Sequence, residues 1–245
     1  MIGTVLTILK IIFILGFLIL IHEGGHFLVA KLCKVRVNEF AIGFGPLAFQ
    51  KQGKETLYSI RWIPLGGYVS MEGETESSEV EGSFSKASIP KRLAIVVAGA
   101  TVNIVFGILL IFLLLWIVRG NAVEALMATG GYLVEVANSL TSMFTGGVSI
   151  DQFTGPVGIS NIVAQTSGWI DFTYILAVIS LSLGVTNLLP IPALDGGKIV
   201  LLLLEAIRRK PLKLETEMAL QTMGFLAIIL LSVYVTYHDV ITIWN

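Results

Sequence analysis

Long apolar runs separated by short polar stretches dominate this chain, and four of them are long enough to cross a membrane. A helix needs about 20 apolar residues to span the hydrocarbon core. Two uninterrupted spans are expected at about 5–30 and 93–118. A third is expected at about 172–204, with a proline break at 190–192, and a fourth at about 218–237. The pattern predicts an α-helical polytopic membrane protein.

The stretch at about 35–73 has a different pattern. Apolar and polar residues alternate over 57–63, and Gly66 and Gly67 follow, which predicts β-strands and turns. Two interpretations stay open: a hairpin with no special role, or an edge strand that holds an extended peptide by strand addition. The acidic segment at about 72–82 predicts a flexible loop. We therefore expect a small membrane-associated β-sheet or hairpin within a single domain.

Two further segments give weaker signals. Residues 123–144 form a helical pattern rich in small residues, which is expected to lie against the membrane. Residues 146–162 contain turn glycines and Pro156 and are too polar to span. This segment is expected to cap the outer face or to re-enter between helices, where protein or water can satisfy its backbone.

Composition supports a membrane protein, because 55% of the residues are hydrophobic, only 13% are charged, and the mean hydropathy is +0.85. The net charge of −1 gives no indication of nucleic acid binding. The single cysteine, Cys33, excludes an intrachain disulfide and is expected to be a small apolar filler. The N-terminal run lacks a small-residue cleavage site, so it is not expected to be a cleavable signal.

Basic residues predict the orientation in the membrane. Nine Lys or Arg residues lie between the first two spans, from Lys31 to Arg92. The connection between the second and third spans contains only Arg119, whereas 208–213 contributes four basic residues. The first and third connections are therefore expected in the cytoplasm and both termini outside.

Within the first span lies the motif H-E-x-x-H, formed by His22, Glu23 and His26. On a helix, positions four apart share a face, so both imidazoles can reach one metal ion while the glutamate stands beside its water. A lone histidine in a membrane helix is more often a packed core residue. Three ionisable groups at membrane depth are costly and therefore indicate a functional site.

A second candidate lies in the proline-broken segment, where Asp195 is the only acidic residue between Asp171 and Glu205. Two histidines and one carboxylate leave a fourth metal position open, which is typical of catalytic zinc. The alternative is that Asp195 caps a helix beginning near Lys198. The two roles are compatible.

The combination of H-E-x-x-H with Leu194-Asp195-Gly196, which follows Asn187-x-x-Pro190-x-Pro192, resembles the site-2 protease family of intramembrane zinc metalloproteases. Further stretches resemble its bacterial branch, typified by the regulator-of-sigma-E protease: Gly43-Phe44-Gly45-Pro46, Pro64-Leu65-Gly66-Gly67-Tyr68-Val69, Ala98-Gly99-x-x-x-Asn103 and Thr154-Gly155-Pro156-Val157-Gly158-Ile159.

The resemblance implies a Zn²⁺ ion held by His22, His26 and Asp195, with Glu23 as general base. It implies cleavage of transmembrane segments of single-pass proteins, such as anti-sigma factors or signal-peptide remnants, in a bacterial inner membrane. The active site would lie toward the cytoplasmic side, and the oligomeric state is left open. The candidate substrate-binding residues are Asn187, Asn103, Tyr58, Ile60, Trp62, Gly66, Gly67 and Tyr68. For Asn187 and Asn103, a structural hydrogen bond between helices is an equal alternative.

Two departures from the family pattern stand out. Ala100 replaces the usual proline of Ala-Gly-Pro, which is expected to soften a helix kink. No PDZ domain fits into 119–122, although this branch usually carries one, so a PDZ filter on substrates is not expected here. The rival functions are a divalent-metal transporter and, more weakly, a prenyl-protein endoprotease. A transporter has no need of the glutamate between the histidines.

Overall fold

The computed structural model describes residues 2–76, 78–144 and 155–244. Four helices in this part of the chain are long and apolar enough to cross a membrane: α1 (Ile2–Leu32), α2 (Ile89–Arg119), α5 (Trp169–Asn187) and α7 (Leu214–Trp244). Between 6% and 28% of each apolar window is buried inside the protein, so most of the helix surface is left for lipid. The predicted polytopic helical fold with about four spans is confirmed.

The third span differs from its prediction. Helix α5 ends at Asn187, and α6 (Asp195–Arg208) is a separate helix of 14 residues, too short to span alone. Pro190 and Pro192 cannot donate backbone hydrogen bonds, and Ala193 adopts a positive φ of 77°. The break is therefore a complete linker, not a kink, and α6 is not part of a continuous 172–204 span.

The chain divides into two compact units. The sheet unit comprises residues 9–104 and 182–226, and the helical unit comprises residues 1–8, 105–181 and 227–245. The helical unit includes α3 (Ala122–Phe144), as expected from the helical pattern over 123–144, and α4 (Pro156–Gln165).

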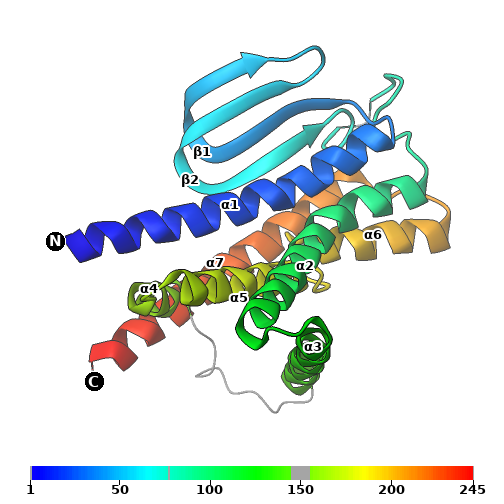
Figure 1. Cartoon of the computed structure of the whole chain (residues 1–245). Helices are drawn as coiled ribbons and strands as arrows, with labels where there is room; N and C mark the ends of the chain where they lie inside the picture. Colours follow the sequence, from blue (N-terminus) through cyan, green and yellow to red (C-terminus); the bar gives the residue numbers. More distant parts are fainter. Residues whose placement is uncertain (1, 77, 145–154, 245) are drawn as a thin grey trace. The chain divides into compact units, whose positions relative to one another are not determined.

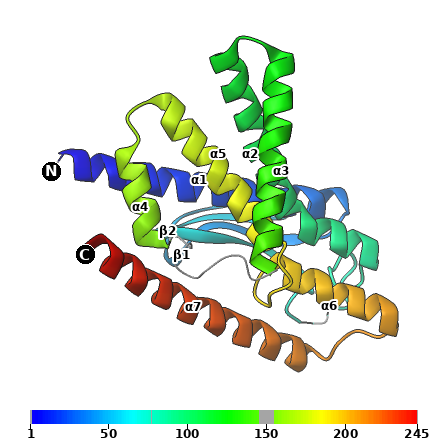
Figure 2. The same ribbon diagram turned by 90° about the horizontal axis from the view of Figure 1, so that it is seen from below.

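Helix α4 covers the end of the segment 146–162, whose residues before 155 lie outside the described part. Figure 2 shows α4 and the beginning of α5 as separate rods joined by a turn. The N-terminus of α4 is capped by a side chain from α7, because the backbone N–H of Gly158 donates to Asp239 at 2.9 Å. Gly155 N–H donates to the same carboxylate at 3.3 Å. Asp239 is buried and supplies the acceptor that α4 lacks locally.

The sheet unit contains β1 (Val37–Gln52) and β2 (Leu57–Met71). Each strand is bent and pairs twice, and the glycines Gly43 and Gly45, at φ of 85° and 80°, allow the bend in β1. Across the sheet, the segments follow the order 67–71, 37–42, 57–61, 47–52. Segment 67–71 pairs antiparallel with 37–42, and 57–61 pairs antiparallel with 47–52. Between these pairs, residue numbers rise in the same direction where 39–42 meets 57–60.

This register corrects the expected edge strand. Tyr58 pairs with both Phe40 and Lys51, and Ile60 pairs with both Ile42 and Phe49. Their backbone is therefore enclosed on both sides, so the interpretation of 58–63 as an edge strand is wrong at 58–60, whereas Arg61 and Ile63 each pair on one side only. In the described part of the chain, the segment 67–71 pairs with β1 alone and forms an open edge.

Figure 1 shows the sheet lying along the part of α1 that belongs to the same unit. The hydrophobic core joins α1, the sheet, the start of α2 and α6, with Cys33 packed at its margin as an apolar filler. Its buried members are Ala30, Val35, Val37, Val69, Met71, Phe84, Ile95, Val96 and Leu202. This core brings four chain segments, distant in sequence, to one place.

A bidentate ion pair fixes α6 against α2 and gives a stability prediction. Arg92 Nη1 donates to Glu205 Oε2 at 2.9 Å, Nη2 donates to Oε1, and the two side chains are only 12% and 16% exposed. We expect Arg92→Met to destabilise the fold by about 3 kcal/mol, because it leaves the carboxylate without its partner. Thermal unfolding in detergent measures this. The double variant Arg92→Met/Glu205→Leu should recover much of the lost stability. If the double variant were as unstable as Arg92→Met alone, the ion-pair explanation would be contradicted.

Candidate metal centre

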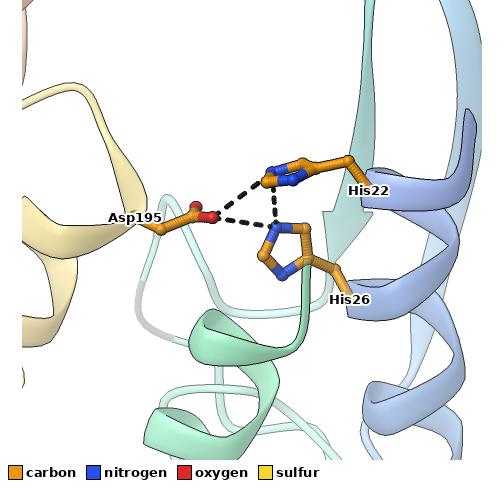
Figure 3. Close-up of side chains that lie close together, drawn as sticks. All are labelled: His22, His26 and Asp195. Atoms are coloured by element: carbon orange, nitrogen blue, oxygen red, sulfur yellow. Dashed lines mark hydrogen bonds and ion pairs between the residues drawn. The ribbon is translucent and has the colours of Figure 1, made fainter. Parts of the chain in front are cut away.

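The motif on α1 and the first residue of α6 meet in the sheet unit. His22 and His26 lie one turn apart on one face of α1, and both rings point toward Asp195 (Figure 3). The two Nε2 atoms are 3.3 Å apart. Asp195 Oδ2 lies 3.3 Å from His22 Nε2 and 3.4 Å from His26 Nε2. Three potential ligand atoms therefore form a nearly equilateral triangle.

The dimensions of this triangle fit zinc. Tetrahedral ligands about 2.1 Å from a zinc ion lie about 3.4 Å from one another. Within the described residues, this is the one group of three or more His, Cys, Asp or Glu side chains placed to hold a metal ion. Asp195 Oδ2 is buried and accepts no hydrogen bond from the described residues. Nitrogen and oxygen lone pairs that converge in this way require a cation.

The alternative role of Asp195 as a helix cap is not supported. The N-cap position of α6 is Leu194, and no side-chain hydrogen bond caps the helix. The helix begins at Asp195 itself and not near Lys198. The carboxylate therefore does not cap the helix, and it faces the histidines.

Close packing of α2 against α1 holds His26. Its Nδ1 donates to the carbonyl oxygen of Ile95 at 2.8 Å, which leaves Nε2 as the ligand atom. A Cβ on Gly99 would lie 2.3 Å from His26 Nε2, and a Cβ on Gly25 would lie 2.7 Å from the carbonyl oxygen of Ala98. Glycine at both positions lets the helices approach closely enough for this contact.

A cavity of about 440 Å³ lies beside the three ligand atoms. Its lining includes His22, Glu23, His26, Gly67, Tyr68, Val69, Ser70, Met71, Glu74, Asn187, Asp195 and Lys198. Glu23 thus shares a space with the metal-type side chains and with the open edge 67–71. Gly67 and Tyr68 of this edge were predicted to bind substrate, but as a loop beside the expected edge strand, because alternation alone does not reveal which strands are paired on both sides.

Gly67, the first residue of the open edge, lies close to Glu23 and gives a second prediction. A Cβ at Gly67 would lie 2.8 Å from the Ala41 carbonyl oxygen and 3.2 Å from Glu23 Cγ. We expect Gly67→Ala to lower substrate cleavage about tenfold, because the new methyl group would press on the neighbouring strand at Ala41 and on Glu23. A cleavage assay measures this at constant zinc content. Gly24→Ala, where a Cβ meets nothing within 4 Å, is the space control; equal losses in both variants would contradict the packing argument.

The other residues predicted from the sheet lie elsewhere. Tyr58, Ile60 and Trp62 are exposed, and the cavity lining in the described part does not include them. Gly66 has a φ of 108°, and a Cβ there would overlap the Phe44 ring. Gly66 therefore shapes the turn before the edge and does not itself face the cavity.

Tyr68 is fastened by charged neighbours in the sheet. Its hydroxyl accepts a hydrogen bond from Arg61 Nη2 at 2.8 Å, and Arg61 also contacts Glu39 at 3.1 Å. Burial and then the carboxylate of Glu39 raise the pKa of Tyr68. Burial works against ionisation of Glu39 as well, but hydrogen bonds from Ser59, Tyr68 and Arg61 outweigh it and lower the pKa of Glu39. At neutral pH the ionised Glu39 therefore holds Arg61, which in turn holds Tyr68 of the open edge.

The two predicted asparagines lie in different positions. Asn187 lines the cavity, and its Nδ2 donates to the Leu183 carbonyl oxygen within α5 at 3.0 Å. Asn103 is fully buried on α2, where its Nδ2 lies 3.3 Å from Nδ1 of His22.

The structure also adds two charged residues to the cavity that the sequence reasoning missed. Lys198 lies one turn beyond Asp195 on α6, and its Nζ donates to Glu74 Oε1 at 2.6 Å. Helical spacing from Asp195 could have indicated Lys198. The position of Glu74, in the acidic segment expected to be flexible, depends on the tertiary fold.

Comparison with known proteins agrees with this geometry. A model of Peptidase family M50 matches residues 10–231. A provisionally named zinc metalloprotease of Clostridium acetobutylicum is 30% identical, over 92% of this chain and 95% of the relative. Another, from Fusobacterium nucleatum, is 29% identical over 98% of this chain and the whole relative. A third, from Streptococcus pneumoniae, is 24% identical over 98% of this chain and 99% of the relative.

The relatives are longer than this chain. The alignment with the Fusobacterium protein spans 340 positions, whereas this chain has 245 residues, so at least 95 positions have no counterpart here. The family match, the provisional names of the relatives and the zinc-sized triangle of His22, His26 and Asp195 agree on one identity. The chain belongs to peptidase family M50, the site-2 protease family, and is a membrane-embedded zinc metalloprotease.

Proposed function

We propose that this protease cleaves peptide bonds in or near the transmembrane segments of single-pass membrane proteins. The observation that carries the proposal is the convergence of His22, His26 and Asp195 within a cavity bordered by an open strand edge. In this proposal the three side chains hold the zinc ion, and the ion supplies Lewis-acid polarisation of water and of a peptide carbonyl when it is bound.

Glu23 is the general base of this proposal. It lies between the two histidines in sequence and lines the same cavity. Its carboxylate takes a proton from the attacking water as the new C–O bond forms. It then delivers this proton to the amine nitrogen as the peptide C–N bond breaks. Asp195 does not serve as the base in this proposal, because its carboxylate is one of the zinc ligands with His22 and His26.

The substrate must present an extended segment, because a helix conceals its own peptide bonds. The edge 67–71 offers unpaired backbone groups along the cavity that contains Glu23. We place the unwound substrate beside this edge, where strand addition would align its backbone. In this proposal Asn187, which lines the cavity, contacts the substrate backbone. The exposed side chains of Tyr58, Ile60 and Trp62 contact substrate residues beyond the cavity.

The proposed setting is a bacterial inner membrane, with the active site toward the cytoplasm and both termini outside. The basic residues between α1 and α2 support this orientation. Anti-sigma factors and signal-peptide remnants are the proposed substrate classes, by resemblance to the regulator-of-sigma-E branch. The function is then regulated intramembrane proteolysis.

Metal analysis of the purified chain tests the ligand set. We expect one zinc ion per chain, and loss of it in both His22→Ala and Asp195→Ala. A co-expressed tagged single-pass substrate should be cut by the wild type and left intact by both variants. Cleavage that survives the loss of zinc would reject the proposal, and metal flux into vesicles without cleavage would favour the transporter.

Cysteine labelling tests the orientation. In a Cys33→Ser background, Lys54→Cys and Asn121→Cys each place one thiol at an exposed position. An impermeant maleimide applied to whole cells stripped of their outer membrane should label Asn121→Cys and spare Lys54→Cys. The opposite pattern would reverse the proposed topology.

A further inference from the structure

His22 has a partner on α2 that the proposed mechanism does not use. Nδ2 of the Asn103 side chain lies 3.3 Å from His22 Nδ1, on the side of the ring opposite the ligand triangle. Asn103 is fully buried and His22 is 8% exposed, so water does not compete at this contact.

The two helices match one another in spacing. On α1, His22 and His26 are four residues apart, and on α2, Asn103 and Gly99 are also four residues apart. His22 meets Asn103, and His26 meets Gly99 and the carbonyl of Ile95. Helix α2 therefore contacts the Nδ1 atom of each histidine. The backbone carbonyl of Ile95 contacts His26, and the side-chain amide of Asn103 contacts His22.

The protonation of the rings follows from this arrangement. A neutral histidine that offers Nε2 to a metal carries its proton on Nδ1, and this N–H needs an acceptor. For His26, the carbonyl oxygen of Ile95 can only accept. For His22, an amide can offer either its oxygen or its NH₂ group, which exchange places by a half-turn about one bond. Only the oxygen can accept a hydrogen bond from Nδ1–H, so the amide must be turned by this half-turn from the orientation in which Nδ2 faces the ring.

We propose that Asn103 is a positioning residue of the metal centre, whose side-chain oxygen accepts the Nδ1–H of His22 and so keeps Nε2 aimed at His26 and Asp195. This inference rests on the proposed ligand set. It replaces the substrate-binding role expected for Asn103 from sequence. Gly99 and Asn103, four residues apart on α2, then match His26 and His22, four residues apart on α1. Gly99 leaves space for the ring of His26, and Asn103 orients the ring of His22.

Zinc retention by the purified full chain tests the proposal, using competition with a chelator of known affinity. We expect Asn103→Leu, of similar volume, to weaken zinc binding about 10–100-fold, the usual effect of losing a partner of a ligating histidine. Asn103→Asp should bind zinc as tightly as the wild type, because a carboxylate also accepts from Nδ1. The absorption spectrum of the Co²⁺-substituted protein should change in the leucine variant and stay nearly unchanged in the aspartate variant.

Thr101→Val is the matched control, because Thr101 lies on the exposed side of α2 and bonds only within its own helix among the interactions described for it. It should retain zinc fully. If Asn103→Leu binds zinc within twofold of the wild type and only raises KM, Asn103 binds substrate and the proposal is overturned. If Asn103→Asp is as weak as the leucine variant, the asparagine acts as a donor, which also overturns it. A wild type without zinc would instead reject the proposed function itself.

Discussion

Glu23→Gln is expected to abolish most cleavage while zinc stays bound. Glutamine keeps the size of the side chain but cannot take the proton from water or return it to the leaving amine. Loss of general acid–base catalysis costs about 10²–10⁴ in rate. Because His22, His26 and Asp195 form the triangle without Glu23, the zinc content should remain at one ion per chain. Single-turnover cleavage of a tagged transmembrane substrate, together with metal analysis, measures both quantities.

The control for this variant is Glu55→Gln, the same chemical change at a glutamate whose only described partner is Lys31. It should cleave normally. Undiminished cleavage by Glu23→Gln would remove Glu23 from the mechanism. Loss of zinc from Glu23→Gln would instead make Glu23 a metal ligand, and the triangle would then be an incomplete description of the site.

Gly99→Ala is expected to weaken metal binding strongly through a single added methyl group. The new Cβ would lie 2.3 Å from His26 Nε2, well inside van der Waals contact, and 2.8 Å from two ring carbons. The ring cannot retreat without breaking its 2.8 Å hydrogen bond to the Ile95 carbonyl. We expect zinc affinity to fall at least about 100-fold, with cleavage lost in parallel. Chelator competition gives the affinity, and the assay for Glu23→Gln gives the activity.

Gly16→Ala controls for the effect of adding a methyl group to a membrane helix. Gly16 lies on α1, and a Cβ there would meet nothing within 4 Å. It should keep both zinc and cleavage, with stability unchanged or slightly raised. Full zinc retention by Gly99→Ala would mean that α2 does not press on His26 as described.

The comparison of sequence with structure is clearest at α1. The apolar run that contains it and the four-residue spacing of His22 and His26 are properties of the local chain. The helical period alone places both imidazoles on one face, so the span and two candidate ligands were predictable. Asp195 was predicted as the third ligand from its isolation in an apolar, proline-broken segment and from the family resemblance. Its approach to within 3.3–3.4 Å of the two histidines required the fold.

The β-rich insert marks the limit of local reasoning. Alternation predicted strands over 57–63, and strands are present. The sequence could not show that residues 57–60 of this segment would be enclosed by both halves of a bent β1, or that 67–71 would form an open edge. A strand becomes an edge only through the absence of a neighbour, and neighbours are chosen by long-range pairing.

The sequence alone therefore determined the membrane spans, apart from the end of the third, as well as the H-E-x-x-H face and the zinc chemistry, because each follows from hydrophobicity, helical period or ligand type within a short stretch. Tertiary structure alone decided the third side of the ligand triangle, the open edge beside Glu23 and the contact between Asn103 and His22. These depend on the packing of α1, α2, α6 and the sheet around one core. Helix–helix contacts as close as the one at Gly99 are set by many side chains together and are not encoded in any one segment.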